Sequence, residues 1–433
     1  MSKYIEIGLP KLEDHIRDDG GKYVRLAVDI KWIDEAGEMN DNLYYEVEEK
    51  YGKFFVTELC DDFVLSLIEI AMEKGYSIHH KAPISEDLKY QLERYFIPIL
   101  SKKFSMLNNI ELIGPVSNIQ LPTEGAIGTG FSGGVDSFYT VLSHNNTIYK
   151  NKNVSYLVLA VNGAAKTGFD ESIDEEWFKR ELNRFEPIAE ELKMKLVGIR
   201  SNVAKLNEGK TYVKGGDAIV TLAFIHALRK LFGTYLWAAA WPIEVLRFDP
   251  NDGGSLEPFS VPMLSVSGLR VYLAGCETDR IGKEKYIADN TIVQNNLTVC
   301  GDVYNCGRCF KCLRTMSELY SIGKLDKFRN TFPVDDYMTH LSSRLAEEFA
   351  IDHHEFINAI KTESNINGIK IPLIVPVKKW LFYKPLHFLR KKLRNNKTLI
   401  KMFYKYGFDE KLNGKKQDER IVKLRIEGKG KSE

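Results

Sequence analysis

The loop Ser132-Gly133-Gly134-Val135-Asp136-Ser137 has the composition of an anion-binding turn. The apolar run from Ala126 to Phe131 predicts a strand that ends at this loop, and a helix is expected to begin near Ser137. Backbone N–H groups at such a helix start point toward an anion, and the two glycines remove the Cβ atoms that would keep it away. Ser132 and Ser137 add hydroxyl donors, so we expect all six residues to hold phosphate groups. Asp136 is either a magnesium-associated carboxylate or an acceptor that braces the loop.

Two better-known phosphate loops do not fit these residues. A Walker loop needs a lysine after its last glycine, and none follows Gly134. The run from Gly128 to Gly133 satisfies G-x-G-x-x-G, but a dinucleotide fold also needs an acidic residue where the next strand ends, and that strand ends with Ala160-Val161-Asn162. An ordinary glycine turn is the remaining alternative.

Four cysteines with metal-ligand spacing lie in one short segment, Cys300-x5-Cys306-x2-Cys309-x2-Cys312. Four thiolates can close a tetrahedral zinc site with Zn–S distances of roughly 2.3 Å. Such a site leaves no open coordination position, so its expected role is structural. An iron–sulfur cluster is the alternative, because C-x2-C-x2-C also suits cubane ligation.

The surrounding pattern predicts an α/β fold with a doubly wound parallel sheet. Apolar runs that predict strands alternate with amphipathic stretches that predict helices, which is typical of a parallel sheet covered on both faces. The expected strands are 126–131, 154–161, 195–200 and 235–240, and the expected helices lie near 137–143, 174–192 and 217–232, where Gly233 closes the last one. We expect three parts: a small α+β domain over residues 1–118, the nucleotide domain with its cysteine loop over 123–325, and a helical, basic extension over 326–433.

Composition and charge fit a globular protein with a basic end. Of the 433 residues, 44% are apolar and 27% are charged, and no run approaches the roughly 18 apolar residues of a membrane span. With no apolar signal segment at the start and clustered cysteines, the expected location is the cytoplasm. Residues 376–433 contain 18 Lys and Arg against 6 Asp and Glu, a net charge of +12 that leaves −11 for the rest. Aromatic residues alternate with this charge from Trp380 to Tyr406, which suits RNA, an anionic membrane, a protein partner or simple docking on the core.

The loop at Ser132–Ser137 resembles the SGGxDS loop of the ATP pyrophosphatases, the superfamily of GMP, asparagine and NAD synthetases and of tRNA sulfur-transfer enzymes. The resemblance implies an adenine nucleotide alpha hydrolase-like fold and cleavage of ATP between the α- and β-phosphates. It also implies that a substrate oxygen attacks the α-phosphate to give an adenylate. ATP and magnesium are therefore the expected ligands.

A longer stretch, from about Gly128 to Leu319, is similar to the 7-cyano-7-deazaguanine synthases. The segments 211–218, 278–285, 298–300 and 306–314 occur in the order of that family, which carries a four-cysteine zinc site. The family's Arg-Asn pair stands here as Gly216-Asp217, and its Tyr-Pro-Asp-Cys-Arg segment has no counterpart near 253–260, so we expect a changed substrate pocket. The resemblance implies that Arg280, Lys283 and Lys285 neutralise the departing pyrophosphate, although a solvated helix face would explain the same charges.

Strand ends supply the expected adenine site. In relatives the base lies along the sheet edge, so the backbone at Ala160, Val161 and Ser201 is expected to contact it, with the side-chain amide of Asn202 as an addition. A purely structural strand end is the alternative for each residue.

The leading functional hypothesis is an AMP-forming ligase that activates a deazaguanine-type carboxylate and passes it to an amine. Longer relatives in antiphage defence resemble ligases that join a deazaguanine to a partner protein, which makes a protein acceptor the second hypothesis. A tRNA sulfurtransferase and a nucleotide-binding module without catalysis are the other two. The expected partners are ATP, a small carboxylate and a protein acceptor, and a homodimer is one of the oligomeric states considered.

Overall fold

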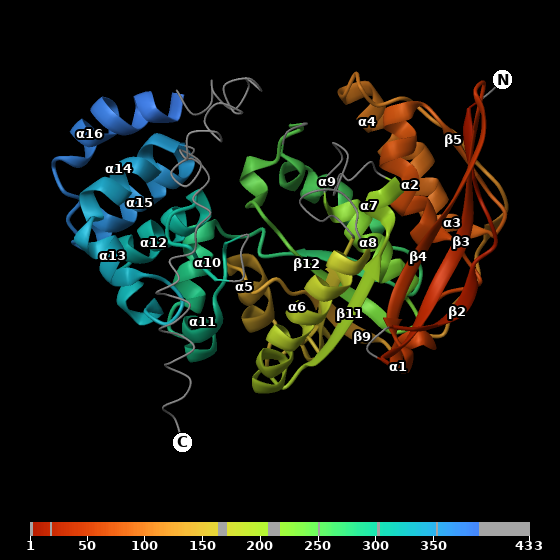
Figure 1. Ribbon diagram of the computed structural model, residues 1–433, viewed down its shortest axis with the longest axis horizontal. Coiled ribbons are helices and arrows are strands. Elements are labelled where there is room, and N and C mark those ends of the chain that lie inside the picture. The colour runs from red at the N-terminus through yellow and green to blue at the C-terminus, as the bar shows by residue number, and fades with distance from the viewer. Residues whose placement is uncertain are drawn as a thin grey trace. The chain divides into compact units, whose positions relative to one another are not determined.

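The computed structural model describes residues 3–17, 20–162, 171–206, 217–249, 252–300, 304–351 and 354–388, with side chains left out at 171–174 and 217. Contacts divide the chain into two compact units (Figure 1). The first comprises Met1–Ser132 and Asp136–Arg280, and the second comprises Gly133–Val135 and Ile281–Glu433. Most of the segment 211–218 and the basic tail beyond residue 388 lie outside the described residues.

Five parallel strands form one half of the sheet in the first unit. Their order is β13 (Arg270–Ala274), β12 (Phe232–Ala238), β9 (Ala126–Gly130), β10 (Tyr156–Val161) and β11 (Lys195–Ser201). The chain thus starts in the middle at β9, adds β10 and β11 on one side, and then returns to add β12 and β13 on the other. This mostly parallel arrangement is compatible with a doubly wound α/β fold, and its topological switch point lies beside β9. The four expected strands are present, and β13 is an additional one.

Three helices follow these strands: α5 (Val135–Ser143), α6 (Glu171–Glu191) and α8 (Asp217–Ala227). Helix α6 lies close to β11 because Gly198 has no side chain; a Cβ there would stand 2.6 Å from the Phe178 ring. The prediction that the third helix extends to Phe232 and is closed by Gly233 is wrong, since α8 ends at Ala227 and both residues lie in β12. Helix α8 is buried on nearly every side, so its apolar residues show no helical period that could mark where it ends.

The N-terminal region extends the same sheet. Strand β4 (Gly37–Glu48) pairs antiparallel with β11, and β3 (Lys22–Asp34), β1 (Tyr4–Ile7), β5 (Ser77–His80) and β7 (Leu112–Ile113) continue outward, with β2 (Lys11–Ile16) beside β3. The sheet therefore has 11 strands. One buried core includes both N-terminal residues such as Ile5 and residues of the parallel half such as Val271. The separate α+β domain over residues 1–118 stays a prediction.

Helices cover the two faces of the sheet, and neighbouring residues of β4 point to opposite faces. The Tyr45 ring packs between Phe63 of α2 (Asp61–Lys74) and Phe224 of α8, with centroids 5.3 and 5.2 Å away. Glu46, the next residue, hydrogen-bonds with groups on the side where α6 packs. Further along the chain, α3 (Glu86–Gln91), the π-helical turn η1 (Leu92–Phe96) and α4 (Ile97–Lys103) form a second helical stretch of the N-terminal region.

The described part of the second unit is helical. Helix α10 spans Arg280–Ile287, and this unit includes its residues from Ile281 onward. The helices that follow are α11 (Thr291–Asn296), α12 (Phe310–Ser321), α13 (Val334–Thr339), α14 (Leu341–Ile351), α15 (His354–Ile366) and α16 (Val375–Lys378). A small core packs α14, α15 and α16 together around Leu345, Ile360 and Val375. Across the described residues, no helix is both long enough and apolar enough to cross a membrane.

Candidate functional site

The loop that follows β9 joins the central strand of the parallel half to the start of α5. Strand β9 ends at Gly130, and α5 begins at Val135. Gly133 takes a φ of +70°, a conformation that residues with a Cβ rarely adopt. Its carbonyl accepts the N–H of Thr298 at 2.8 Å, and this bond braces the turn. The loop thus has the strand–turn–helix form in which backbone N–H groups face a ligand.

The side chains of the loop supply two hydroxyl groups and one carboxylate, and α10 supplies a guanidinium group beside them. The Ser132 and Ser137 hydroxyls lie 3.5 Å apart, Ser132 exposed and Ser137 buried. Arg280, at the start of α10, places a guanidinium nitrogen 3.8 Å from a carboxylate oxygen of Asp136. That distance is too long for a good hydrogen bond but gives an ion pair, so two of the predicted catalytic residues lie together. Both side chains keep partial access to solvent, which a ligand-binding pair requires.

The position of the loop in the sheet is the one where α/β folds bind ligands. It follows the carboxyl end of β9, which lies between β10 and β12 at the switch point. At the neighbouring strand ends, Val161 and Ser201 are both buried. The Ser201 hydroxyl accepts the N–H of Val203, and the Asn202 amide binds Tyr44 N–H and the Asn42 carbonyl of β4 at 3.0 Å each. The side chains of Ser201 and Asn202 therefore support the fold. At these strand ends, a ligand would contact the backbone.

The two predicted lysines of α10 differ in their surroundings. Lys283 is almost completely buried. Lys285 is about half exposed and donates to Glu363 of α15 at 2.6 Å. Its ammonium is therefore engaged by a carboxylate of the helical unit.

The four predicted cysteine ligands come together in the second unit. Their sulfur atoms all lie within 4.8 Å of one another, with Cys300 and Cys309 at 3.8 Å and Cys306 and Cys312 at 4.0 Å. Such a group can hold a metal ion such as zinc. In the thiol form the sulfurs share protons: Cys300 raises the pKa of Cys306, but hydrogen bonds with Cys309 and Cys312 lower it to about 6, while the pKa values of Cys309 and Cys312 are raised. Four thiolates this close repel each other, and a bound cation removes that repulsion.

Local structure around the cysteines is built to hold them. The amide of buried Asn305 accepts the N–H groups of Val299 and Cys300 and donates to the carbonyls of Leu297 and Thr331. Gly307 has a φ of +70°, and a Cβ there would stand 2.3 Å from Pro333. Cys309 caps α12 and Cys312 lies in its first turn, where the helix dipole favours thiolates.

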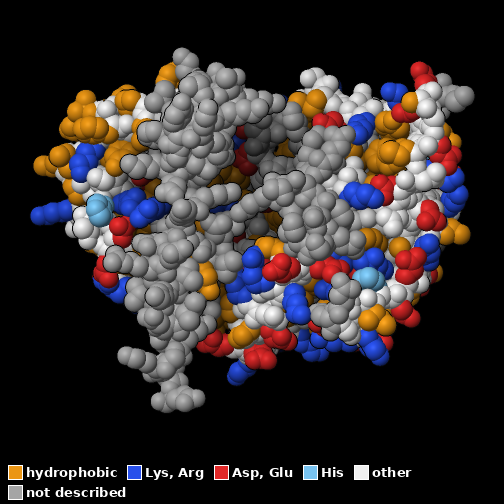
Figure 2. All heavy atoms as spheres, viewed as in Figure 1, with side chains coloured by type: hydrophobic (Ala, Val, Ile, Leu, Met, Phe, Trp, Pro, Cys, Tyr) orange, Lys and Arg blue, Asp and Glu red, His pale blue; other side chains and the backbone are white. Residues whose placement is uncertain are grey.

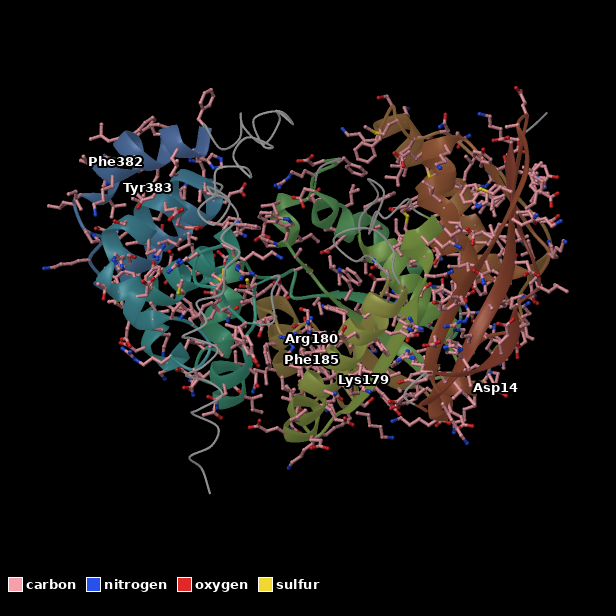
Figure 3. The ribbon with its side chains drawn as sticks, in the orientation of Figure 1. Asp14, Lys179, Arg180, Phe185, Phe382 and Tyr383 are labelled. Carbon is pink, nitrogen blue, oxygen red and sulfur yellow. The ribbon has the colours of Figure 1, made fainter. Side chains whose placement is uncertain are left out.

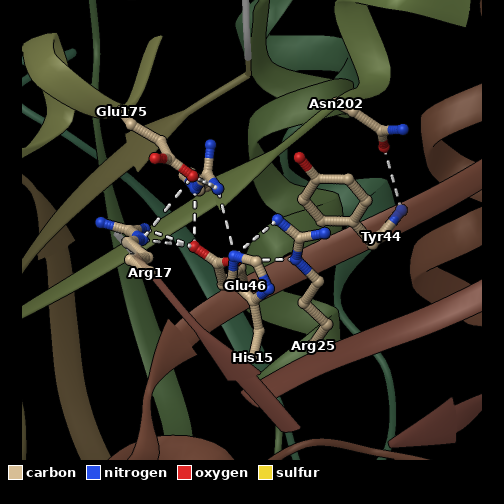
Figure 4. Close-up of polar contacts among 8 residues, drawn as sticks. His15, Arg17, Arg25, Tyr44, Glu46, Glu175 and Asn202 are labelled. Atoms are coloured by element: carbon tan, nitrogen blue, oxygen red, sulfur yellow. Dashed lines mark hydrogen bonds and ion pairs between the residues drawn. The ribbon is translucent and has the colours of Figure 1, made fainter. Parts of the chain in front are cut away.

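A buried charge network that was not predicted lies in the first unit (Figure 4). Glu46 is completely buried. Its carboxylate accepts hydrogen bonds from Arg17, from Arg25 at 2.7 Å and from Arg200 at 2.7 Å. His15 lies 3.6 Å away, and Arg200 also donates to Glu175 of α6. Burial would raise the pKa of Glu46, but Arg200 and Arg17 lower it to about 2. We call these six residues the Glu46 network.

The network has a simple origin in the strand register. Arg25, Glu46 and Arg200 are directly paired neighbours on β3, β4 and β11, so their side chains share one face of the sheet. The signal in the sequence is slight, because strand alternation places Glu46 on the face opposite Tyr45 and Val47, where a charged residue is common. A charge at such a position is rarely buried without a partner. Its partners are up to 154 positions away in the sequence, and no local pattern predicts which residues they are.

No protein-family model, curated protein or solved structure matches this chain.

Proposed function

We propose that this protein is an ATP-dependent ligase that activates a carboxylate by transferring AMP to it and then passes the acyl group to an amine. The observation that supports this most is the Ser132–Ser137 loop, which follows the central strand β9 at the switch point of the parallel half. Helix-start N–H groups, two hydroxyls and the nearby Arg280 suit a polyphosphate. The resemblance to 7-cyano-7-deazaguanine synthases points to a deazaguanine-type acid.

The proposed reaction has two steps. In the first, an oxygen of the substrate carboxylate attacks the α-phosphorus of ATP, the bond to the oxygen that bridges to the β-phosphate breaks, and pyrophosphate leaves with that electron pair. The loop N–H groups, Ser132, Ser137 and Arg280 would stabilise the negative charge that grows on the phosphates in the transition state. In the second, an amine nitrogen attacks the acyl carbon, AMP leaves, and the nitrogen gives up a proton to solvent.

Magnesium fits this chemistry through Asp136. Its carboxylate lies on the loop, is partly exposed and faces Arg280 at 3.8 Å. Oxygen ligands of this kind are those that Mg²⁺ prefers. When bound, the ion supplies positive charge against the polyphosphate.

Zinc fits the cysteine cluster better than an iron–sulfur cluster does. A tetrahedral ion with Zn–S distances of roughly 2.3 Å needs sulfurs roughly 3.8 Å apart. Two of the pairs measure 3.8 and 4.0 Å, and all lie within 4.8 Å. A cubane must place four irons between its ligands and needs wider spacing. This favours the ligase over the tRNA sulfurtransferase. A reducing compartment would keep the thiols able to bind metal, which supports a cytoplasmic location.

The test is pyrophosphate–ATP exchange with purified protein, magnesium and 7-carboxy-7-deazaguanine. Exchange of labelled pyrophosphate into ATP reports the adenylate alone, so it does not require the amine to be known. We expect exchange that depends on the acid, and mass spectrometry should find AMP and an amide once ammonia is added.

Matched serine variants of α5 make this test specific. Ser137→Ala should lower exchange about tenfold or more through the loss of one donor to the phosphates. Ser143→Ala, at the other end of the same helix with its hydroxyl bonded to the Tyr139 carbonyl at 2.7 Å, should leave the rate unchanged. ATP binding without exchange on any of a panel of carboxylates would contradict the proposal.

A further inference from the structure

The last described helix presents large apolar side chains to solvent. Helix α16 continues into the π-helical turn η7 (Lys379–Tyr383) and on to Phe388. Six side chains, which we call the Trp380 patch, are each between 50% and 96% exposed: Leu373, Ile374, Val377, Trp380, Leu381 and Phe382. Figure 2 shows hydrophobic side chains gathered where Figure 1 places α16. Large apolar side chains grouped on a folded surface mark a site of association.

The patch is held outward by contacts on the opposite side of the helix. Val375 is fully buried in the small core of the helical unit, and Tyr383 packs against the same core. Lys378 donates to the hydroxyls of Ser342 and Ser343 on α14 at 2.8 and 2.9 Å. Figure 3 labels Phe382 and Tyr383 in this last helical segment. The apolar surface is therefore displayed by an anchored helix.

The charges beside the patch indicate what it contacts. Lys384 is exposed and places its ammonium 4.0 Å from the centre of the Trp380 ring. The chain from residue 376 to 433 carries 18 Lys and Arg against 6 Asp and Glu, and the rest of the protein is acidic. A partner must accept aliphatic and aromatic side chains and also present negative charge. RNA meets the second requirement but gives Leu373, Ile374 and Leu381 nothing to bury against.

We propose that the Trp380 patch binds the surface of an anionic lipid bilayer, lying in the interface without crossing it. Trp and Phe side chains would enter the boundary between headgroups and acyl chains, and lysines would meet the lipid phosphates. The described part of this helix, residues 375–388, is shorter than a bilayer span, which agrees with an interfacial position. Membrane attachment does not depend on the ligase proposal, since it concerns a different surface.

Co-flotation of the full-length protein with vesicles tests this. One set of vesicles is phosphatidylcholine, and the other is an equal mixture of phosphatidylcholine and phosphatidylglycerol. We expect flotation with the mixed vesicles and little with phosphatidylcholine alone. Trp380→Ala and Phe382→Ala should each weaken partitioning about tenfold, because each removes a large apolar side chain from the interface. Ile148→Ala, at an isoleucine 84% exposed in the other unit, should partition as the wild type does.

The outcomes separate the patch from the basic tail. Because the two aromatic side chains are exposed, their removal should leave the circular dichroism spectrum unchanged, so a loss of flotation reports binding and not folding. No flotation with either vesicle type overturns the proposal. Equal flotation of the wild type and both patch variants also overturns it, since the tail alone would then bind. Competition by RNA at the patch, with no vesicle binding, would assign this surface to nucleic acid.

Discussion

The cysteine cluster and the Glu46 network assemble charged or ionisable groups in two different ways. The cluster takes its four sulfurs from one short segment of the helical unit, between Cys300 and Cys312. The network takes its side chains from β2 and the residue after it, from β3, β4 and β11, and from α6. The hydrogen bond between Glu46 and Arg200 joins residues 154 positions apart. A metal ion can organise the first, whereas only the completed sheet can organise the second. The two should therefore fail differently when one residue is removed.

Loss of one cysteine should have the largest effect, because an ion bound by the four sulfurs would supply folding energy that no side chain replaces. Structural zinc sites in small peptides contribute about 10–16 kcal/mol. We expect Cys309→Ser to lose most of about one zinc per chain, measured by plasma mass spectrometry, and to unfold the helical unit at a lower temperature. The control is Cys276→Ser, at a half-buried cysteine outside the cluster. Equal zinc content in Cys309→Ser and wild type would contradict the site.

Removal of the central carboxylate of the Glu46 network should have the next largest effect. Glu46→Gln leaves three arginines around a neutral amide, and breaking a buried ion pair costs about 3–5 kcal/mol. We expect that loss in the free energy of unfolding measured with urea, and no change in zinc content. Glu13→Gln is the matched control, since Glu13 is the β2 neighbour of Arg25 but is exposed. A change of less than about 1 kcal/mol in Glu46→Gln would mean that solvent reaches the network.

These two regions also show what the sequence alone can predict. Strand, glycine turn and helix around Ser132–Ser137 follow from local patterns, and so does the cysteine cluster, because all their parts are neighbours in the chain. Pairing of β4 with β11 brings residues together that no local pattern connects, and the Glu46 network depends on it. The predicted end of α8 was wrong for a related reason, because a helix buried on nearly every side lacks the apolar periodicity that shows where it ends. Prediction failed where tertiary contacts decide.

A pH titration of stability separates the two regions further. The pKa of Glu46 lies near 2 in the folded protein against an ordinary value of 4.5, which corresponds to about 3 kcal/mol. Because the folded pKa is depressed, this stability is complete above about pH 4.5 and is lost as the pH falls toward 2. Urea unfolding at several pH values should show a shallower acid loss in Glu46→Gln than in wild type. Asp61, whose pKa is also about 2, contributes the same acid-sensitive stability to both proteins. If the free energy of unfolding fell equally with pH in wild type and Glu46→Gln, the assignment to Glu46 would be contradicted.

The ion pair of Lys285 and Glu363 tests whether distance in sequence or burial sets the energy of a charge pair. It joins residues 78 positions apart, like the network, but Lys285 is about half exposed. If burial sets the energy, a double-mutant cycle of Lys285→Met and Glu363→Gln should give a coupling below about 1 kcal/mol in urea unfolding. The same variants bear on the ligase, because a lysine held by Glu363 is poorly placed for pyrophosphate. We expect Lys285→Met to retain most of the pyrophosphate–ATP exchange that Arg280→Met loses. An equal loss of exchange in both variants would mean that Lys285 leaves Glu363 when ATP binds. The pyrophosphate role that the family resemblance implies for Lys285 would then hold despite the ion pair.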